Sequence, residues 1–201
     1  MSGKPDKERQ KGFSLIELLI VVVILGILVA LAINSFRETN EKYKIESATK
    51  EMFADIMDVR ARALQRNRVS FVSVMSNSYE TYEDTNPLPD GNGILEPVNP
   101  SASVGGTNNS DTRVTRVDRE SGKLKGAYVF DVGGGLMLSH GSTPTESFRF
   151  NRNGIASADG FIRIRFPQNP NLRPDYDCIR ISPTRVKTGQ FNTVGGTCVE
   201  K

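Results

Sequence analysis

The hydrophobic pattern of the chain begins with a long apolar run. Residues 13–33 contain one charged side chain, that of Glu17, and no proline. As a helix this run would be about 32 Å long, which matches the hydrocarbon core of a bilayer. The pattern therefore predicts that residues 13–33 form the transmembrane part of a helix.

Residues 34–68 keep a helical period but are polar on one side. Apolar residues recur at steps of three and four, and oppositely charged residues between them are spaced for i,i+3 and i,i+4 pairs. No proline occurs between Lys11 and Asn86. We therefore expect one continuous helix from Phe13 to about Gln65, whose amphipathic second half is half-buried against a soluble domain. The apolar stripe comprises Ile45, Ala48, Met52, Ile56, Val59 and Ala63.

Residues 69–201 have the composition of strands and turns. The β-branched and aromatic residues at 69–74 predict a strand directly after the helix. Residues 76–112 contain most of the turn signals and predict a long, acidic, exposed loop with room for a hairpin. Further strands are expected at 112–117, 126–132, 135–139, 146–150, 161–166 and 177–181.

Charge predicts the orientation of the apolar run. Residues 1–12 contain four basic and two acidic side chains, and basic residues before a span favour the cytoplasmic side. This places residues 69–201 across the membrane. The chain carries a net charge of only +3, so no general basic field indicates nucleic acid. A signal peptide is the competing interpretation, but the run is long for one.

The two cysteines, Cys178 and Cys198, both lie within the last 24 residues. In an oxidising compartment we expect them to form a disulfide that joins a late strand to the C-terminus. A metal pair or a redox pair is disfavoured, because the spacing is not C-x-x-C and His140 is the only histidine. His140 lies near Ser139 and Ser142 without a placed third partner, so we expect no enzymatic activity.

The start of the apolar run carries the most specific motif. Gly12 is followed by Phe13-Ser14-Leu15-Ile16-Glu17 and then by the unbroken run. This arrangement resembles the class III signal of type IV prepilins and type II secretion pseudopilins. The resemblance implies that a prepilin peptidase removes residues 1–12 by cutting after Gly12. It also implies that the new amino group of Phe13 is methylated and that Glu17 is retained.

Physical chemistry supports a role for Glu17 in assembly. A charged side chain near the centre of a membrane helix costs about 2.5–3.5 kcal/mol on insertion scales. Cleavage would leave a cationic amine on Phe13, and Glu17 of one subunit can pair with that amine on its neighbour. The alternative is a carboxylate that snorkels to the interface. Many members of the family carry a proline near this position, where this chain has Asn34 instead. The sequence therefore gives no reason to expect a proline-induced kink.

Later segments resemble the GspH/FimT-type group of minor pseudopilins and minor pilins. They lie at 59–69, 150–154 with 160–164, and 178–187, where Thr184-Arg185 replaces the usual Gly-Arg. The resemblance implies an α+β fold in which a long helix packs on a small antiparallel β-domain. It also implies a cofactor-free structural subunit near the tip of a filament, with a single-pass inner-membrane helix and a periplasmic β-domain. Its implied partners are the prepilin peptidase and other pilin or pseudopilin subunits.

Oxygen donors and glycines cluster in the acidic loop. Such a set could hold calcium, a hard cation that takes six to eight oxygen ligands. The set misses EF-hand spacing, and a solvated turn is the alternative interpretation. Its residues are Asp84, Asn86, Asp90, Asn92 and Glu96.

Residues 149–187 contain eight basic and three acidic side chains. Strand alternation would place several of the basic ones on one face, which could bind the DNA backbone nonspecifically. A charged sheet face, or an interface with acidic subunits, is the alternative. The candidates are Arg163, Arg165, Arg180, Arg185 and Lys187. The sequence leaves open a secretion pseudopilin, a DNA-binding minor pilin, and a solitary membrane protein whose leader matches by chance.

Overall fold

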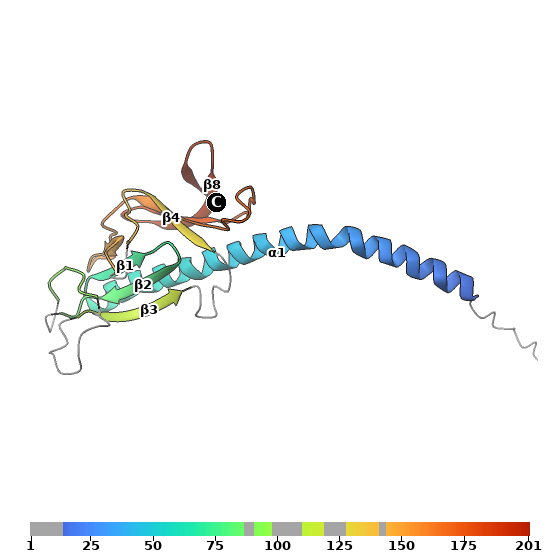
Figure 1. Cartoon of the computed structure of the whole chain (residues 1–201). Helices are drawn as coiled ribbons and strands as arrows, with labels where there is room; N and C mark the ends of the chain where they lie inside the picture. Colours follow the sequence, from blue (N-terminus) through green and yellow to red (C-terminus); the bar gives the residue numbers. More distant parts are fainter. Residues whose placement is uncertain (1–13, 87–90, 98–109, 119–127, 141–143) are drawn as a thin grey trace, which may run out of the picture. The chain divides into compact units, whose positions relative to one another are not determined.

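The computed structural model describes residues 14–86, 91–97, 110–118, 128–140 and 144–201, without the side chains of residues 31–35. These residues form an α+β fold with one helix and nine strands (Figure 1). The helix is α1 (Leu15–Arg66). The strands are β1 (Ser70–Val74), β2 (Ser78–Glu83), β3 (Thr112–Asp118), β4 (Val129–Gly134), β5 (Phe148–Phe150), β6 (Gly160–Arg165), β7 (Cys178–Ile181), β8 (Val186–Asn192) and β9 (Thr197–Glu200).

The helix α1 is continuous, as the sequence pattern predicts. It ends at Arg66, one residue beyond the predicted end. Asn67 follows with a φ of 52°, and the N–H of Arg68 donates to the carbonyl of Ala63 at 3.2 Å. A left-handed residue with this hydrogen bond is a common helix C-cap, in which asparagine is tolerated better than most residues. The cap turns the chain directly into β1.

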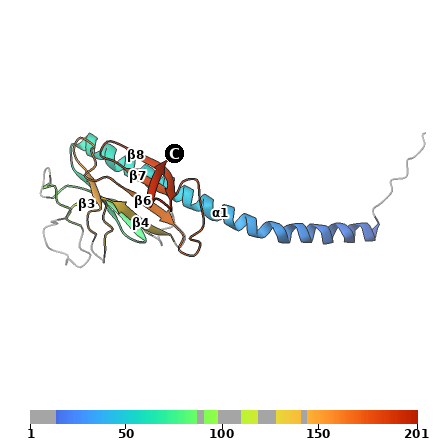
Figure 2. The ribbon, with the colours of Figure 1, turned by 90° about the horizontal axis from the view of Figure 1, so that it is seen from above.

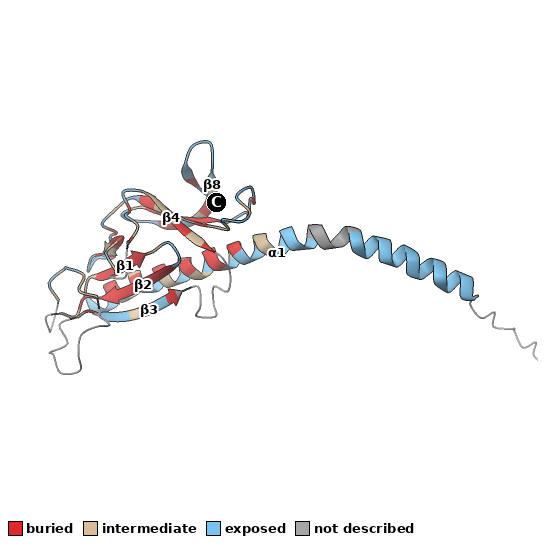
Figure 3. Cartoon of the chain, viewed as in Figure 1, coloured by how far each residue is buried: buried red, intermediate tan, exposed pale blue. Residues whose placement is uncertain are grey.

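The chain divides into two compact units, Met1–Asn40 and Glu41–Lys201, and α1 belongs to both. In the first unit, the described side chains from Ser14 to Ala30 are all exposed (Figure 3). Across the ranges that the structure describes, no helix combines the length and the apolar character needed to cross a membrane.

The second unit contains two antiparallel sheets. Their strand orders are β3-β2-β1-β5 and β4-β6-β7-β8-β9. The residues of α1 that belong to this unit run along the strands (Figure 2). A small antiparallel β-domain therefore packs on the second half of the helix, as expected.

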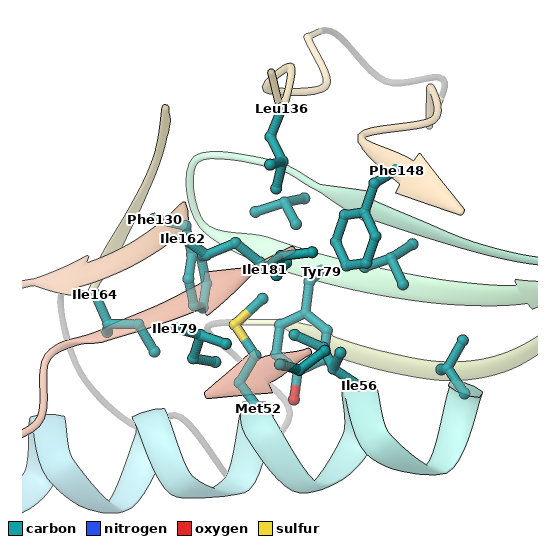
Figure 4. Close-up of a cluster of buried hydrophobic side chains, with 14 of the residues drawn as sticks. Met52, Ile56, Tyr79, Phe130, Leu136, Phe148, Ile162, Ile164, Ile179 and Ile181 are labelled. Carbon is teal, nitrogen blue, oxygen red and sulfur yellow. The ribbon is translucent and has the colours of Figure 1, made fainter. Parts of the chain in front are cut away.

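The core lies between α1 and the strands. All six residues of the predicted apolar stripe are buried, and Met52 and Ile56 are completely so. The side chains of Met52 and Ile56 point from α1 towards Tyr79 of β2 and Ile179 of β7 (Figure 4). Burial raises the pKa of Tyr79, so its hydroxyl stays protonated and donates to Oδ2 of Asp55 at 2.6 Å. This hydrogen bond ties the helix to β2.

The prediction of an exposed loop at 76–112 was wrong for its first part. Residues Ser78–Glu83 form β2, which is buried along its whole length between β1 and β3. Its acidic residues concealed it, because a buried carboxylate needs partners that a sequence pattern does not show. Oε2 of Glu83 lies 2.5 Å from Arg66, and Oε1 lies 3.3 Å from Arg68. These ion pairs join the end of α1 to β2.

Most other predicted strands are present with small changes at their ends, as β1 and β3 to β7. The strand expected at 135–139 is not among the described strands. Gly134, with a φ of 74°, ends β4, and Ser139 forms only an isolated bridge with Met75. The strands β8 and β9 were not predicted, because their largely polar sequences lack the β-branched alternation that marks a strand.

The packing predicts different roles for two methionines of α1. Met52 is completely buried, whereas Met57 is 37% exposed. Met52→Ala should lower the free energy of unfolding by about 2–5 kcal/mol, because it removes core contacts and leaves a cavity. Met57→Ala should lower it by about 1 kcal/mol or less. Urea denaturation of residues 41–201, followed by tyrosine fluorescence, measures both, and equal losses would contradict the assigned helix face.

Candidate functional site

Glu17 lies in the first turn of α1 and is exposed. The N–H groups of Glu17 and Leu18 donate to the carbonyl of Ser14 at 3.1 and 3.2 Å, so the helix begins directly after Ser14. The apolar side chains around it are exposed as well, and no ion pair joins its carboxylate to another described residue. The carboxylate is therefore accessible to a cation of another molecule. Gly12 and Phe13, the predicted cleavage and methylation positions, lie outside the described residues.

The predicted disulfide joins β7 to β9. The Cα atoms of Cys178 and Cys198 are 6.0 Å apart, within the usual range for a disulfide. Between them runs β8, where Gly189 allows the close approach. A Cβ atom at Gly189 would lie 3.2 Å from the sulfur of Cys198 and 2.2 Å from the carbonyl oxygen of Val199. Any larger residue would therefore have to displace the backbone of β9.

The oxygen donors considered for calcium are hydrogen-bonded within their own loop. The carboxylate of Asp84 accepts the N–H of Asn92 at 3.1 Å and that of the next residue at 2.7 Å. Glu96 accepts hydrogen bonds from the side-chain amides of Asn86 and Asn92. Asp90 lies outside the described residues. Among the described ones no group of three or more acidic, cysteine or histidine side chains is arranged to hold a metal ion, and calcium binding stays a prediction.

Asp111, which the sequence pattern did not single out, completes this network. Its carboxylate accepts N–H groups from Thr85, Asn86 and Glu96 at 3.0, 3.3 and 2.8 Å. Burial raises the pKa of both Asp84 and Asp111, and the charge of Asp111 raises that of Asp84 further. No local sequence signal marks Asp111, because the residues that it binds lie at least 15 positions away.

The raised pKa values predict how stability depends on pH. A carboxyl group with a higher pKa in the folded than in the unfolded chain stabilises the fold most below its ordinary value of 3.8. That contribution is lost as the pH rises through the raised pKa. As the pH rises, the free energy of unfolding should therefore fall less steeply in the double variant Asp84→Asn, Asp111→Asn than in the parent.

Urea denaturation between about pH 3.5 and 6 measures these two slopes. Asp177 and Glu146, whose pKa values burial also raises, remain in both proteins and do not affect the comparison. Equal slopes would show that Asp84 and Asp111 titrate normally in the folded chain.

The candidate DNA-binding residues gather on the five-stranded sheet, but most of them are paired. Arg163 and Arg165 share the outer face of β6, as predicted, and Arg180 lies opposite Lys187 in the β7–β8 ladder. Arg185 is exposed. The other four have carboxylate partners: Arg163 with Asp177 (3.7 Å), Arg165 with Asp131, Arg180 with Asp159 (2.6 Å) and Lys187 with Glu200 (2.8 Å). The face thus carries charges of both signs.

Comparisons with known proteins give matches of three kinds. Residues 7–33 match the family model described as "Prokaryotic N-terminal methylation motif". Two fimbrial proteins of Pseudomonas aeruginosa are each 31% identical over 125 residues, which cover 60% of this chain and 77% of each relative. The solved structure of the minor pseudopilin EpsH from the Type 2 Secretion System of Vibrio cholerae aligns with a TM-score of 0.45 and 7% identity, over 72% of this chain and 97% of EpsH. The fimbrial relatives match far more of the chain than the methylation motif alone.

Proposed function

This chain belongs to the type IV pilin and pseudopilin family, and from that premise we propose that it is a minor pseudopilin of a type II protein secretion system. It assembles into a filament rooted in the inner membrane, or primes the tip of that filament, and carries out no chemistry of its own. The segments at 59–69, 150–154 with 160–164, and 178–187 support this branch of the family, because they resemble the GspH/FimT-type group.

The position of Glu17 carries the proposal. Its carboxylate is exposed among apolar side chains that are themselves exposed from Leu15 to Ala30. In lipid or in an apolar helix bundle, such a carboxylate is stable only when a cation neutralises it. The prepilin peptidase cuts after Gly12 and methylates Phe13. The Phe13 amine of one subunit then pairs with Glu17 of the next, which fixes the stagger between them.

The same segment anchors the subunit. Residues 13–33 cross the inner membrane once, with the leader in the cytoplasm and residues 69–201 in the periplasm. The basic residues of the leader support this orientation. The disulfide between Cys178 and Cys198 supports an oxidising compartment for the β-domain.

Complementation of a deletion strain tests the role of Glu17. The parent chain should restore release of secreted proteins into the medium, whereas Glu17→Ala and the isosteric Glu17→Gln should not, because both remove the anion. Glu38→Ala removes a carboxylate from the same helix outside the apolar run, and as the matched control it should restore secretion. Immunoblots of sheared filaments measure incorporation of each variant. Secretion restored by Glu17→Ala would contradict the assembly role.

Two further observations in the same strains test the rest of the proposal. Mass spectrometry of the native subunit should find a chain that begins with N-methylated Phe13, and a retained leader would contradict processing. Intact secretion combined with loss of surface pili in the deletion strain would place the chain in a pilus system instead.

DNA binding for uptake is the second candidate function. The basic excess of residues 149–187 favours it, but carboxylate partners neutralise most of the candidate side chains. We expect duplex DNA to show no retardation by the detergent-solubilised chain above about 100 mM salt, because few phosphates can be neutralised. Mobility shifts across a salt series measure this. DNA uptake would be favoured by binding that persists above this salt concentration. That binding should also be lost in the double variant Arg185→Ala, Lys187→Ala and kept in Arg152→Ala.

A further inference from the structure

A cleft of about 540 Å³ opens beside the outer face of the five-stranded sheet. Its volume lies in the range of about 300–1,000 Å³ that is typical of ligand sites. The segment before β7 and the β8–β9 hairpin both contribute to its walls. We call it the Arg163 cleft, and its principal residues are Arg163, Leu172, Arg173, Asp177, Phe191 and Lys201.

Arg163 is held in the cleft with hydrogen-bonding capacity unused. Its side chain is 15% exposed, and its guanidinium carbon lies 4.2 Å from the centre of the Phe191 ring. Such stacking holds the planar guanidinium in one orientation. Its Nε atom is buried and forms no hydrogen bond with any described residue. A charged group in this state is costly, and a ligand that accepts hydrogen bonds from the part of the guanidinium that remains accessible would lower that cost.

The carboxylate nearest to Arg163 in the cleft neutralises it only in part. Oδ1 of Asp177 accepts the N–H of Phe191 at 2.6 Å, while Oδ2 lies 3.7 Å from Nε of Arg163. The distance of 3.7 Å exceeds that of a hydrogen bond, so the ion pair neutralises Arg163 only in part.

Two further cations line the cleft. Arg173 donates to the hydroxyl of Thr193 at 3.3 Å, a neutral partner that leaves its charge uncompensated. Lys201 pairs at 3.2 Å with Asp175, whose side chain is 76% exposed, and such an exposed pair is weak. Because Asp177 is the only acidic residue in the lining, the described lining has a positive excess.

We propose that the Arg163 cleft binds a carboxylate group, which receives hydrogen bonds from Arg163 and further attraction from Arg173 and Lys201. The planar guanidinium matches the two oxygens of a carboxylate. A monoanion fits better than a phosphate dianion, because Asp177 already places a negative charge in the cleft. The volume exceeds that of a carboxylate alone, and Leu172 and Phe191 supply apolar walls for the rest of the ligand. The proposal is independent of the filament's function.

The carboxylate can come from an acidic side chain of a partner protein or from a free organic acid. Two-dimensional NMR of the ¹⁵N-labelled full chain in detergent micelles distinguishes these sources through the Nε–H signal of Arg163 and the backbone signals of Phe191 and Thr193. The probes are acetate, N-acetylglutamate amide and inorganic phosphate, at matched ionic strength in sodium chloride. Both carboxylates should shift these signals saturably. Tighter binding of the capped glutamate indicates a side-chain ligand, and equal binding indicates a free acid.

Variants test which residues bind. Arg163→Gln should weaken carboxylate binding by about tenfold or more, because it removes a charge-assisted hydrogen-bonding group. The double variant Arg173→Gln, Lys201→Gln should weaken carboxylate binding less. Arg152→Gln removes an exposed arginine outside the cleft lining and should leave binding unchanged. If Arg163→Gln fails to fold, the double variant at Arg173 and Lys201 decides, because both residues lie on exposed surface.

Three results would overturn the proposal. The first is a set of shifts that do not saturate and that sodium chloride alone reproduces. The second is carboxylate binding that survives both sets of substitutions. The third is tighter binding of phosphate than of either carboxylate, since the cleft would then recognise polyanions such as nucleic acid.

Discussion

The apolar stripe of α1 packs against both sheets of the second unit at once. Met52 and Ile56 are buried between the helix, Tyr79 of one sheet and Ile179 of the other (Figure 4). Each sheet alone would leave one apolar face in water, and burial of that face against a shared helix is the main favourable term in folding. The hydrogen bond from Tyr79 to Asp55 adds a directional contact at the same place. The arrangement of the strands, and so of every charged group on them, depends on this packing.

The buried charged groups differ in how completely their neighbours neutralise them. Each acidic group buried in β2 or in the loop after it has donors around it: Glu83 has Arg66 and Arg68, and Asp84 has two backbone N–H groups. Glu17 differs, because it lies among apolar side chains and no ion pair reaches it within the described residues. Arg163 is the opposite case, a largely buried cation whose carboxylate neighbour lies beyond hydrogen-bonding distance. Both proposals therefore start from charges that the described part of the chain leaves incompletely neutralised.

The helix α1 carries two different distributions of apolar residues along its length. From Leu15 to Ala30 the apolar residues occupy all sides of the helix, which suits lipid or neighbouring helices. After Glu41 they form a single stripe, which suits one protein surface. The proposed filament role needs both properties, because the same element would have to polymerise and to carry a folded domain.

The sequence alone determined the helix, its stripe and the family, because each depends on a local period or on a motif with fixed spacing. It also determined the disulfide, because the chain has two cysteines and they can pair only with each other. The face that Arg163 and Arg165 share also followed from strand alternation. Strand β2 could not be predicted, since its buried Glu83 needs two arginines that the end of α1 and the turn after it bring to it. Asp111 and the Arg163 cleft were equally inaccessible, because their partners are brought together by the sheet and not by proximity along the chain. Only the tertiary structure decided which charges are neutralised, since an ion pair depends on distances of a few ångströms between residues far apart in sequence.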